Sequence, residues 1–320
     1  MQIVRGLHNI RAHHRGSVLT IGNFDGVHLG HRLVIAHLNA KRDALGAPST
    51  LLTFEPQPRE FFQGRAIPPR LTRFREKMVL LSRTGLDQVI CLPFNEHMAS
   101  LTAQVWIEEF LVRRLGVRFV VLGDDSRFGR DRGGDYALVR GAAERFGFGA
   151  SHLGTLSIEE ARVSSTRIRD ALAIGDFGVA EELLGHRYFV MGHVVYGRQL
   201  GRQLGIPTAN LRLGRYKSPL SGVFVVDVEL DGQRHGGIAN VGVRPTVGGT
   251  EPLVEAHLFD YSGELYGKLM TVTFRARIRD EQTFPGLDAL KAQIALDCEQ
   301  ARAWLRADSE RPPAPVVERR

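Results

Sequence analysis

The sequence has few cysteines and no long apolar run. Its two cysteines, Cys91 and Cys298, lie far apart and form no Cys-x-x-Cys pattern. The sequence therefore gives no support to a disulfide framework or a zinc site, and a reducing cytoplasm fits best. No stretch approaches the roughly 18 apolar residues of a membrane-spanning helix, and the N-terminus lacks the apolar centre of a signal peptide. We expect a cytoplasmic protein that binds no membrane.

Blocks of basic residues are also missing, although the formal net charge is +7. A positive charge favours anionic ligands in general, among them nucleotides and nucleic acid. The lysines and arginines are scattered, however, and no strand carries a stripe of aromatic residues interleaved with arginine. Such a stripe is typical of proteins that bind single-stranded nucleic acid. We therefore expect a small anionic ligand and no nucleic-acid partner.

The length of 320 residues favours two domains, because one hydrophobic core seldom serves so long a chain. In the first half, short apolar strands alternate with helical stretches, which indicates an α/β domain with a parallel sheet covered on both faces. Strands are predicted at 17–22, 50–54, 88–94 and 118–123, and helices at 31–45, 71–84, 102–115 and 134–146. Ligands of such sheets bind at the carboxyl ends of the strands.

The second half has a different pattern, with short strands separated by Gly, Pro and Asp-Gly turns. Many short strands at regular spacing predict a barrel or a sandwich, and a helix over 286–306 has the apolar side needed to close it. The end of the chain is rich in proline and charge, which indicates disorder. The expected domains are 1–185 and 186–307, followed by a disordered tail at 308–320.

The stretch TIGNFDGVHLGH, residues 20–31, follows the first predicted strand and opens a helix. Glycines allow the backbone to approach a ligand closely, and a helix N-terminus attracts anions. His28 and His31 stand one helical turn apart, so both imidazoles can face one phosphate. Removing one such donor typically raises a barrier by about 3–4 kcal/mol. A metal pair fits less well because no third ligand has a suitable spacing. The alternative is a strand-to-helix turn in which the histidines are incidental.

A second candidate site begins with a glycine-rich stretch that contains Gly197, Gly201 and Gly205. Its backbone can lie against phosphates, although the sequence has no GxxxxGK[ST] motif. Thr208 and Asn210 are oxygen donors on alternate residues, which suits a hard cation such as Mg²⁺. The alternative is an Asn-capped turn after Pro207. Glu255 lies in a predicted strand between apolar neighbours, where a carboxylate ordinarily faces solvent.

These motifs, taken together and in order, resemble the bacterial bifunctional riboflavin kinase/FMN adenylyltransferases, also called FAD synthetases. The first half shares the HxGH signature of the nucleotidyltransferases. The segments that carry this half of the resemblance are GNFDGVHLGH, TFEPQPREFF, RLT, EK, PFNEHMASLTAQ, VVLGDDSRFGRDRGGD and VSSTRIRDAL. The second half is similar to the family's kinase module through GRQLGIPTANL, GVFVV, GIANVGVRPTV, EAHLFDYSGELYG and FPGLDALKAQIALD.

For the first domain, the resemblance implies a Rossmann-like nucleotidyltransferase that transfers AMP from ATP to FMN. It assigns His28 and His31 to catalysis. The ATP-binding residues that it implies are Gly22, Asn23, Asp25, His28, His31, Ser165, Thr166 and Arg167. The flavin-binding residues that it implies are Asp125, Ser126, Arg127 and Phe128. Without the family, Ser165 would simply be the N-cap of a helix.

For the second domain, the resemblance implies an antiparallel β-barrel riboflavin kinase with a closing helix. It assigns ATP binding to Gly197, Gly201, Gly205, Thr208 and Asn210. Thr208 and Asn210 would also coordinate Mg²⁺, and Glu255 would be the general base on the ribityl 5′-hydroxyl. The implied whole is FAD biosynthesis in two steps from riboflavin and ATP by way of FMN, in a monomer or transient homo-oligomer.

Two positions of the first domain depart from the family pattern. Gln57 stands where the family usually has histidine, and Ser126 stands where it usually has phenylalanine. Loss of an aromatic ring removes stacking worth roughly 0.5–1.5 kcal/mol. One alternative is therefore a riboflavin kinase whose N-terminal domain binds nucleotide without catalysis. A second alternative, from another class, is an RNA-binding regulator that senses FMN.

Overall fold

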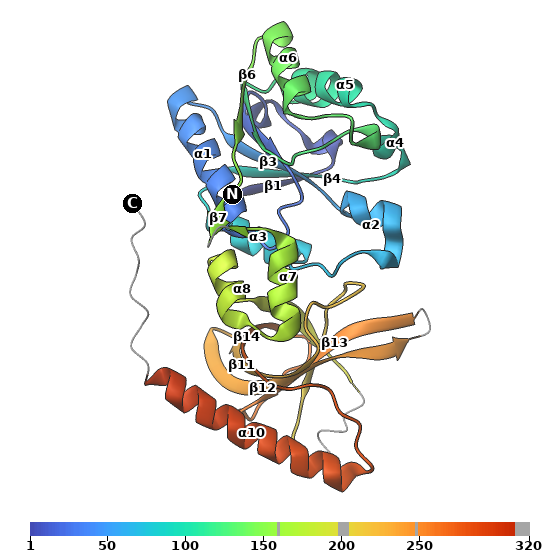
Figure 1. Cartoon of the computed structure of the whole chain (residues 1–320), viewed down its shortest axis with the longest axis vertical. Coiled ribbons are helices and arrows are strands. Elements are labelled where there is room, and N and C mark those ends of the chain that lie inside the picture. Colours follow the sequence, from blue (N-terminus) through green and yellow to red (C-terminus); the bar gives the residue numbers. More distant parts are fainter. Residues whose placement is uncertain (159–160, 198–204, 247–248, 311–320) are drawn as a thin grey trace. The chain divides into compact units, whose positions relative to one another are not determined.

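The computed structural model describes residues 1–158, 161–197, 205–246 and 249–310 (Figure 1). These residues divide into two compact units. The first comprises Met1–Ile168 and Leu183–Gly185, and the second comprises Arg169–Glu182 and His186–Arg320. Gly201 and residues 311–320 of the expected tail lie outside the described residues. Within the described part of the chain, no helix is both long and apolar enough to cross a membrane.

The first unit is built on a parallel sheet of six strands in the order β1-β4-β3-β2-β5-β6. Its strands are β1 (Gln2–Arg5), β2 (Val18–Ile21), β3 (Ser49–Phe54), β4 (Gln88–Leu92), β5 (Phe119–Gly123) and β6 (Gly149–Leu153). All residues of β3 and β4 are buried, as expected of strands covered on both faces. The predicted α/β domain with a parallel sheet is confirmed, and β1 and β6 are additions that the sequence pattern did not indicate.

Helices connect these strands. They are α1 (Leu29–Leu45), α2 (Pro58–Gln63), α3 (Phe74–Ser82), α4 (Glu96–Ser100), α5 (Ala103–Trp106), the π-helix η4 (Ile107–Arg114) and α6 (Tyr136–Phe146). Short helical turns are η1 (Leu7–Asn9), η2 (Ala12–His14), η3 (Gly64–Ala66) and η5 (Arg130–Arg132), and β7 (Ser157–Ile158) pairs with β8 (Ala161–Arg162). The chain passes between the units within two more helices, α7 (Ser165–Ile174) and α8 (Phe177–Leu184), and again just after α8, between Gly185 and His186.

The order of the strands places a topological switch at β2 and β5. From β2 the chain continues to β3 and then β4 on one side, whereas β5 leads to β6 on the other. Ligands of open α/β sheets bind outside the carboxyl ends of the strands at such a switch. The loops that carry the predicted HxGH and flavin motifs follow β2 and β5, so both begin at this switch.

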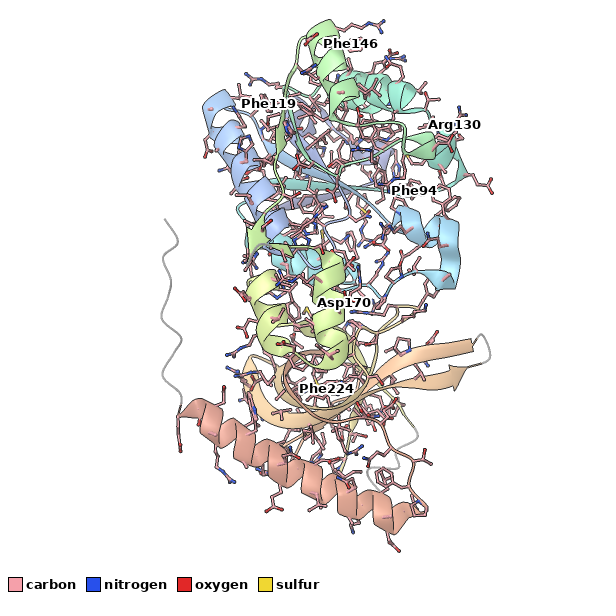
Figure 2. All side chains as sticks on the ribbon, viewed as in Figure 1. Phe94, Phe119, Arg130, Phe146, Asp170 and Phe224 are labelled. Carbon is pink, nitrogen blue, oxygen red and sulfur yellow. The ribbon has the colours of Figure 1, made fainter. Side chains whose placement is uncertain are left out.

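The second unit contains a closed barrel in the order β10-β13-β12-β11-β14-β9. Its antiparallel strands are β9 (Phe189–Val195), β10 (Ala209–Arg212), β11 (Gly222–Leu230), β12 (Gln233–Thr246), β13 (Gly249–Leu258) and β14 (Leu269–Arg279). Phe224 belongs to the barrel's apolar core and meets Phe274 edge to face at 5.4 Å (Figure 2). The barrel is confirmed. Strand β10 closes the barrel by pairing with β9 and β13. The stretch after Pro207 therefore forms a strand, and the alternative of an Asn-capped turn there is wrong.

Helix α10 (Leu287–Ser309) is the predicted closing helix. It packs on the barrel through a small apolar cluster that includes Val225, Ile238 and Ala301. Three arginine–aspartate pairs add to this contact: Arg275 with Asp308, Arg279 with Asp297, and Arg302 with Asp260. In the Arg279–Asp297 pair the atoms Nη2 and Oδ2 are 2.7 Å apart, and the Asp297 side chain is only 2% exposed.

We expect Asp297→Ala to lower the free energy of unfolding of the second unit by about 3 kcal/mol, because it leaves the Arg279 guanidinium without its buried partner. The chain has two tryptophans, of which Trp304 lies on α10 and Trp106 in the first unit. Denaturant unfolding followed by Trp304 fluorescence in a Trp106→Phe background measures the effect. Asp260→Asn is the control: it removes the charge of an exposed ion pair, which contributes little, and asparagine tolerates the φ of 56° at this position, so the midpoint should stay close to that of the parent protein. Equal midpoints for Asp297→Ala and the parent protein would contradict this account.

Candidate functional site

The loop between β2 and α1 has an unusual backbone. Phe24 and Val27 have positive φ values of 48° and 43°, and Gly26 has a φ of 85°. A Cβ atom on Gly26 would lie 2.8 Å from Cδ1 of Leu71, so only glycine fits there. Gly22 donates its N–H to the carbonyl oxygen of Leu52 at 3.1 Å. The loop is therefore held in a strained conformation, which is common at functional sites.

The two predicted histidines come together at the start of α1. His28 is the N-cap, and its Nδ1 accepts the backbone N–H of His31 at 3.4 Å. The two imidazoles stack with centroids 3.6 Å apart, and Phe24 stacks on the other side of His31 at 4.6 Å. The His28 ring therefore carries its proton on Nε2 when it is neutral. Phe24 is a site residue that the sequence did not reveal.

The electrostatic environment keeps His31 neutral at pH 7. Burial lowers the pKa of His31 well below 6.5, and the nearby charges of His28 and Lys77 lower it further. Its Nδ1 atom is buried and has no hydrogen-bond partner among the described residues. A neutral imidazole keeps one N–H, so His31 can act as a donor to an anion without carrying a charge of its own.

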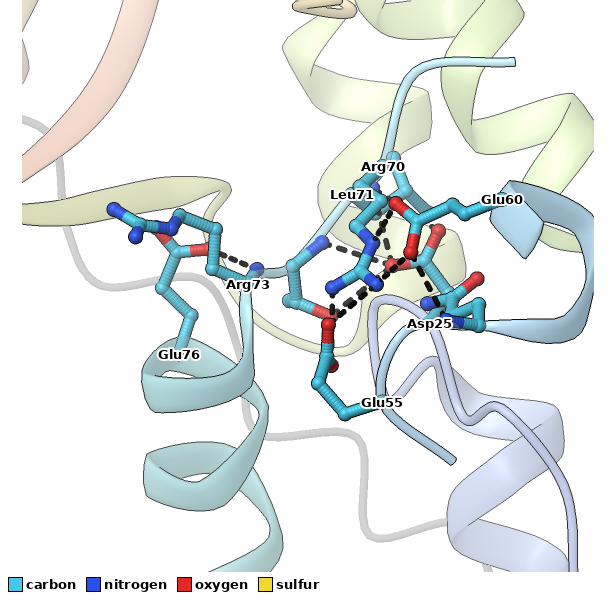
Figure 3. A network of polar contacts seen from close by, with 9 residues as sticks. Asp25, Glu55, Glu60, Arg70, Leu71, Arg73 and Glu76 are labelled. Carbon is cyan, nitrogen blue, oxygen red and sulfur yellow. Dashed lines mark hydrogen bonds and ion pairs between the residues drawn. The ribbon is translucent and has the colours of Figure 1, made fainter. Parts of the chain in front are cut away.

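Asp25 connects the HxGH loop to the segment 70–72 (Figure 3). Its carboxylate accepts the backbone N–H groups of Leu71 at 3.0 Å and Thr72 at 2.9 Å, and the Thr72 hydroxyl at 3.1 Å. The same hydroxyl oxygen accepts the N–H of Gly26 at 3.0 Å. Helix α3 begins at Phe74 instead of residue 71 because Arg73 is its N-cap: the Arg73 backbone is extended, and its N–H donates to Oε2 of Glu76 at 2.6 Å in a capping box.

Arg70 extends this network to the end of β3 and to α2 (Figure 3). Its guanidinium donates to Glu55 at 2.7 Å and to Oε1 of Glu60 at 2.5 Å, with a further short contact to the second Glu60 oxygen. Glu60 in turn accepts the N–H of Gln57 at 2.9 Å. Burial lowers the pKa of Arg70, but the hydrogen bonds to both glutamates outweigh it and raise the pKa. Arg70 therefore stays charged at every physiological pH.

The second predicted phosphate motif lies next to the HxGH loop. The Ser165 hydroxyl donates to the carbonyl oxygen of Asp25 at 3.1 Å. Arg167 donates to the carbonyl oxygens of Ile158 and Ala161 at 3.2 and 3.3 Å. The hydroxyl of Ser164 accepts the N–H of Arg167 at 3.3 Å, so Ser164 caps α7 and the N-cap interpretation of Ser165 was wrong. In the same region Thr166 is exposed and Asn23 is half-buried.

The predicted flavin-binding residues form the loop after β5. The hydroxyl of Ser126 accepts the N–H of Gly123 at 3.1 Å, Arg127 is exposed, and Asp125 pairs with Arg162. Phe128 is half-buried against Trp106, with ring centroids 5.1 Å apart. Ser126 therefore stabilises a turn where the family usually places an aromatic ring.

A cluster of phenylalanines at the ends of β3 and β4 and on α2 was missed. Phe61, Phe62 and Phe94 are in mutual edge contact, with centroids 5.3 to 5.7 Å apart, and Phe54 meets Phe94 at 5.6 Å. Phe61 and Phe62 are 37% and 66% exposed. Exposed rings that gather in one place indicate a binding surface. The adjacent phenylalanines of the segment REFF were the available signal.

In the second unit, the strand register brings the predicted kinase residues together. Glu255 of β13 pairs with Asn210 of β10 on one side and with Asn240 of β12 on the other. Directly paired residues point to the same face of a sheet, so Asn240 joins the candidate site although the sequence did not single it out. A Cβ atom on Gly197 would lie only 2.4 Å from Nδ2 of Asn210. Glycine is therefore needed where the chain passes Asn210.

The environment of Asn210 suits a cation. Its side chain is buried, and its Oδ1 atom has no hydrogen-bond partner among the described residues. Thr208 lies half-buried just before β10, and Gly205 has a φ of 77°. No group of three or more His, Cys, Asp or Glu side chains in the described part of the chain can hold a metal ion. A hydroxyl, an amide oxygen and phosphate oxygens form the kind of donor set that Mg²⁺ accepts.

Comparisons with known proteins agree with this division. The FAD synthetase family matches residues 10–167, and the riboflavin kinase family matches residues 184–305. The bifunctional riboflavin kinase/FMN adenylyltransferase of Pseudomonas fluorescens is 46% identical over 312 residues, which cover 97% of this chain and 100% of the relative. The protein of the same name from Haemophilus influenzae is 46% identical over 308 residues, with 96% and 100% coverage.

A solved structure is also similar. It is described as the crystal structure of a macrolide-efflux protein from Streptococcus pneumoniae. The two chains are 30% identical with a TM-score of 0.80, and the alignment covers 95% of this chain and 100% of the other. The likeness shows that the two proteins share their fold.

The fold and the two sites define a two-domain transferase that acts on phosphorus-containing groups. The chain belongs to the family of bifunctional riboflavin kinase/FMN adenylyltransferases. It has an N-terminal FAD synthetase domain and a C-terminal riboflavin kinase domain. The predicted family, fold class and bifunctional enzyme class are confirmed.

We expect Asp25→Asn to lower the free energy of unfolding of the first unit by about 2 kcal/mol. The side-chain amide keeps the shape of the carboxylate but presents N–H groups or a neutral oxygen to donors that need a charged acceptor. Trp106 fluorescence in a Trp304→Phe background reports this unit during denaturant unfolding. Asp43→Asn, at an exposed aspartate of α1, is the matched control without an expected effect. A parent-like midpoint for Asp25→Asn would show that the 70–72 segment is held in another way.

Proposed function

We propose that this chain makes FAD in two steps at the two sites described. The barrel site phosphorylates riboflavin with ATP to give FMN and ADP. The site at the end of the parallel sheet joins FMN to the AMP portion of a second ATP and releases pyrophosphate. The observation that most supports the second step is the stack of His28 and His31 at the start of α1. The free thiols Cys91 and Cys298 suit a reducing cytoplasm as the place of the reaction.

In the kinase step, Glu255 is the general base. Its carboxylate takes the proton of the ribityl 5′-hydroxyl while the oxygen bonds to the γ-phosphorus of ATP and the bond to the leaving ADP breaks. Thr208 and Asn210 would hold the Mg²⁺ that arrives with ATP, and this ion neutralises charge on the phosphates when bound. The buried Oδ1 of Asn210 supports that assignment, because it is an acceptor without a partner among the described residues.

In the adenylyl transfer, the FMN phosphate is already a nucleophile. One of its oxygens bonds to the α-phosphorus of ATP, and the bond from that phosphorus to the pyrophosphate oxygen breaks, so no covalent enzyme intermediate is needed. His28 and His31 donate N–H groups to the oxygens on which negative charge grows. Ser165, Thr166 and Arg167 follow on the neighbouring helix as donors to the other phosphates. Asp25 acts indirectly, because its hydrogen bonds hold the HxGH loop in place.

The flavin ring needs an aromatic or apolar surface, and two places offer one. The loop after β5 contributes Phe128, with Asp125, Ser126 and Arg127 around it. Because Ser126 has no ring, we assign most of the stacking to Phe61 and Phe62, which are exposed and grouped. If Phe61 and Phe62 stack on the flavin, the adenylyltransferase remains functional although Ser126 has no aromatic ring.

The two activities should separate by mutation. The double change His28→Ala with His31→Ala should lower FAD formation by at least about 10³-fold, because each donor is worth roughly 10²–10³, and should leave FMN formation intact. Glu255→Ala should lower FMN formation by about 10²–10⁴-fold, and FAD should still form when FMN is supplied. Incubation with riboflavin, ATP and Mg²⁺ followed by chromatography of FMN and FAD measures both. Joint loss in either variant would contradict separate sites.

The wild-type protein in the same assay also distinguishes the alternative functions. Accumulation of FMN without FAD would show that the N-terminal domain binds nucleotide without catalysis. Formation of neither FMN nor FAD would favour the other alternative, an RNA-binding regulator that senses FMN.

We also expect Asn210→Ala to raise the Mg²⁺ concentration for half-maximal FMN formation by about tenfold, because one oxygen ligand is lost. FMN formation is measured across a Mg²⁺ titration at saturating ATP. FAD formation from added FMN in the same preparation is the control, since Asn210 belongs to the second unit. An unchanged Mg²⁺ dependence would remove Asn210 from the metal site.

A further inference from the structure

Lys77 is a buried lysine that the reaction described so far does not use. It lies near the start of α3 and is 0% exposed. Its Nζ atom has no hydrogen-bond partner among the described residues. An enclosed ammonium group without a partner is strongly unfavourable. A lysine kept in such a place therefore needs an explanation beyond packing.

The charged groups around Lys77 are engaged with other residues. Asp25 and Glu55 favour its charged form, whereas burial and the charge of Arg70 oppose it, and together they lower its pKa. The Asp25 carboxylate is bound by the segment 70–72, and the Glu55 carboxylate is bound by Arg70. Neither carboxylate is hydrogen-bonded to Lys77. The two carboxylates near the Lys77 ammonium are thus hydrogen-bonded to other residues.

Lys77 belongs to the same edge of the sheet as the histidine stack. The segments of α1 and α3 meet at both ends: Asn39 of α1 donates to the carbonyl oxygen of Thr84 just beyond α3 at 2.9 Å, and Asp25, before α1, accepts the N–H groups of Leu71 and Thr72, before α3. Helix α1 follows β2 at the carboxyl edge of the parallel sheet, and the bonds from Asp25 bring the start of α3 to the same loop. His28 and His31 are in the first turn of α1, and Lys77 is the fourth residue of α3. The charge of Lys77 acts on His31 strongly enough to lower its pKa.

We propose that Lys77 is a positioning residue of the adenylyltransferase site: its buried ammonium adds positive charge near His31 and draws the polyphosphate of a nucleoside triphosphate onto His28 and His31. This inference rests on the proposed function. A charge enclosed by protein acts through a low dielectric and is little screened by salt. The phosphates of the nucleotide would then supply the negative partner that Lys77 lacks among the described residues.

A purely structural role makes a different prediction. If Lys77 only compensated Asp25 and Glu55, Lys77→Met would leave two carboxylates uncompensated and destabilise the first unit. If Lys77 is kept for the phosphates, methionine of similar length should fit the enclosed space and leave stability equal or higher. The two roles therefore differ in whether activity and stability fall together.

The experiment compares full-length wild type, Lys77→Met and Lys77→Arg in FAD formation from FMN and ATP with Mg²⁺. We expect Lys77→Met to lower kcat/KM for ATP by about 10- to 100-fold, with a Tm no lower than that of the wild type, and Lys77→Arg to recover part of the loss. Lys41→Met, which removes the same charge farther along α1, is the matched control and should stay near wild type. FMN formation from riboflavin should be unchanged in all variants.

A pH profile gives a second readout that a structural role would not change. Because Lys77 has a lowered pKa, wild-type kcat/KM for FAD formation should fall as the pH rises through that pKa, and Lys77→Met should lack this fall. Cys91, His28, His31, Asp25, Glu55 and Arg70 are the other titratable groups that face this region. Cys91→Ser should retain the fall, which separates the thiol from the amine.

Three results would overturn the inference. Lys77→Met could show wild-type kcat/KM and the wild-type pH profile. Its loss of FAD formation could also track a loss of Tm and disappear at lower temperature, which would assign Lys77 a structural role. A wild-type protein that forms no FAD would overturn the proposed function together with this inference, whereas active wild type with an active Lys77→Met overturns the inference alone.

Discussion

The carboxylate of Asp25 is the contact on which the N-terminal site depends. It lies in a loop whose backbone is strained, and it accepts two backbone N–H groups from a segment 46 and 47 residues farther along the chain. Charged acceptors make the stronger hydrogen bonds of proteins. With this bond in place the HxGH loop, the start of α3 and the Arg70 pairs become one rigid assembly. In the function that we propose, the histidines are therefore already ordered before a ligand binds.

The two sites solve the same chemical problem with different architecture. Both must bring the phosphates of ATP toward an oxygen nucleophile while the developing charge is stabilised. In the function that we propose, the parallel sheet does so with helix N-termini and neutral imidazoles. The barrel would do so with oxygen donors that its register places side by side, Asn210 and Asn240 beside Glu255. Local periodicity defines the first arrangement, whereas pairing between strands distant in sequence defines the second.

Sequence alone predicted what local pattern determines. A periodic pattern or a turn motif in the sequence marks several features of the fold. They are the buried strands, the turn before α1, the change to closely spaced short strands after residue 185, and the closing helix. Prediction from the sequence failed where a residue distant along the chain determines the local structure. The conformation of segment 70–72 depends on Asp25, and strand β10 exists because β9 and β13 pair with it. The burial of Lys77 likewise arises only when separate segments pack together. The stack of Phe24 on His31 is local, but it accompanies a positive φ at Phe24 that leaves no pattern in the sequence.

The loop between β2 and α1 also limits how this protein can be improved. Positive φ angles at Phe24 and Val27 are conformations that glycine or asparagine would adopt more easily. Replacing Phe24 by asparagine would relax the backbone, but it would also remove a buried ring that stacks on His31, and the lost burial outweighs the relief of strain. The strained backbone at Phe24 is therefore tied to its ring: the packing of the loop and the orientation of the His31 imidazole both depend on the same side chain.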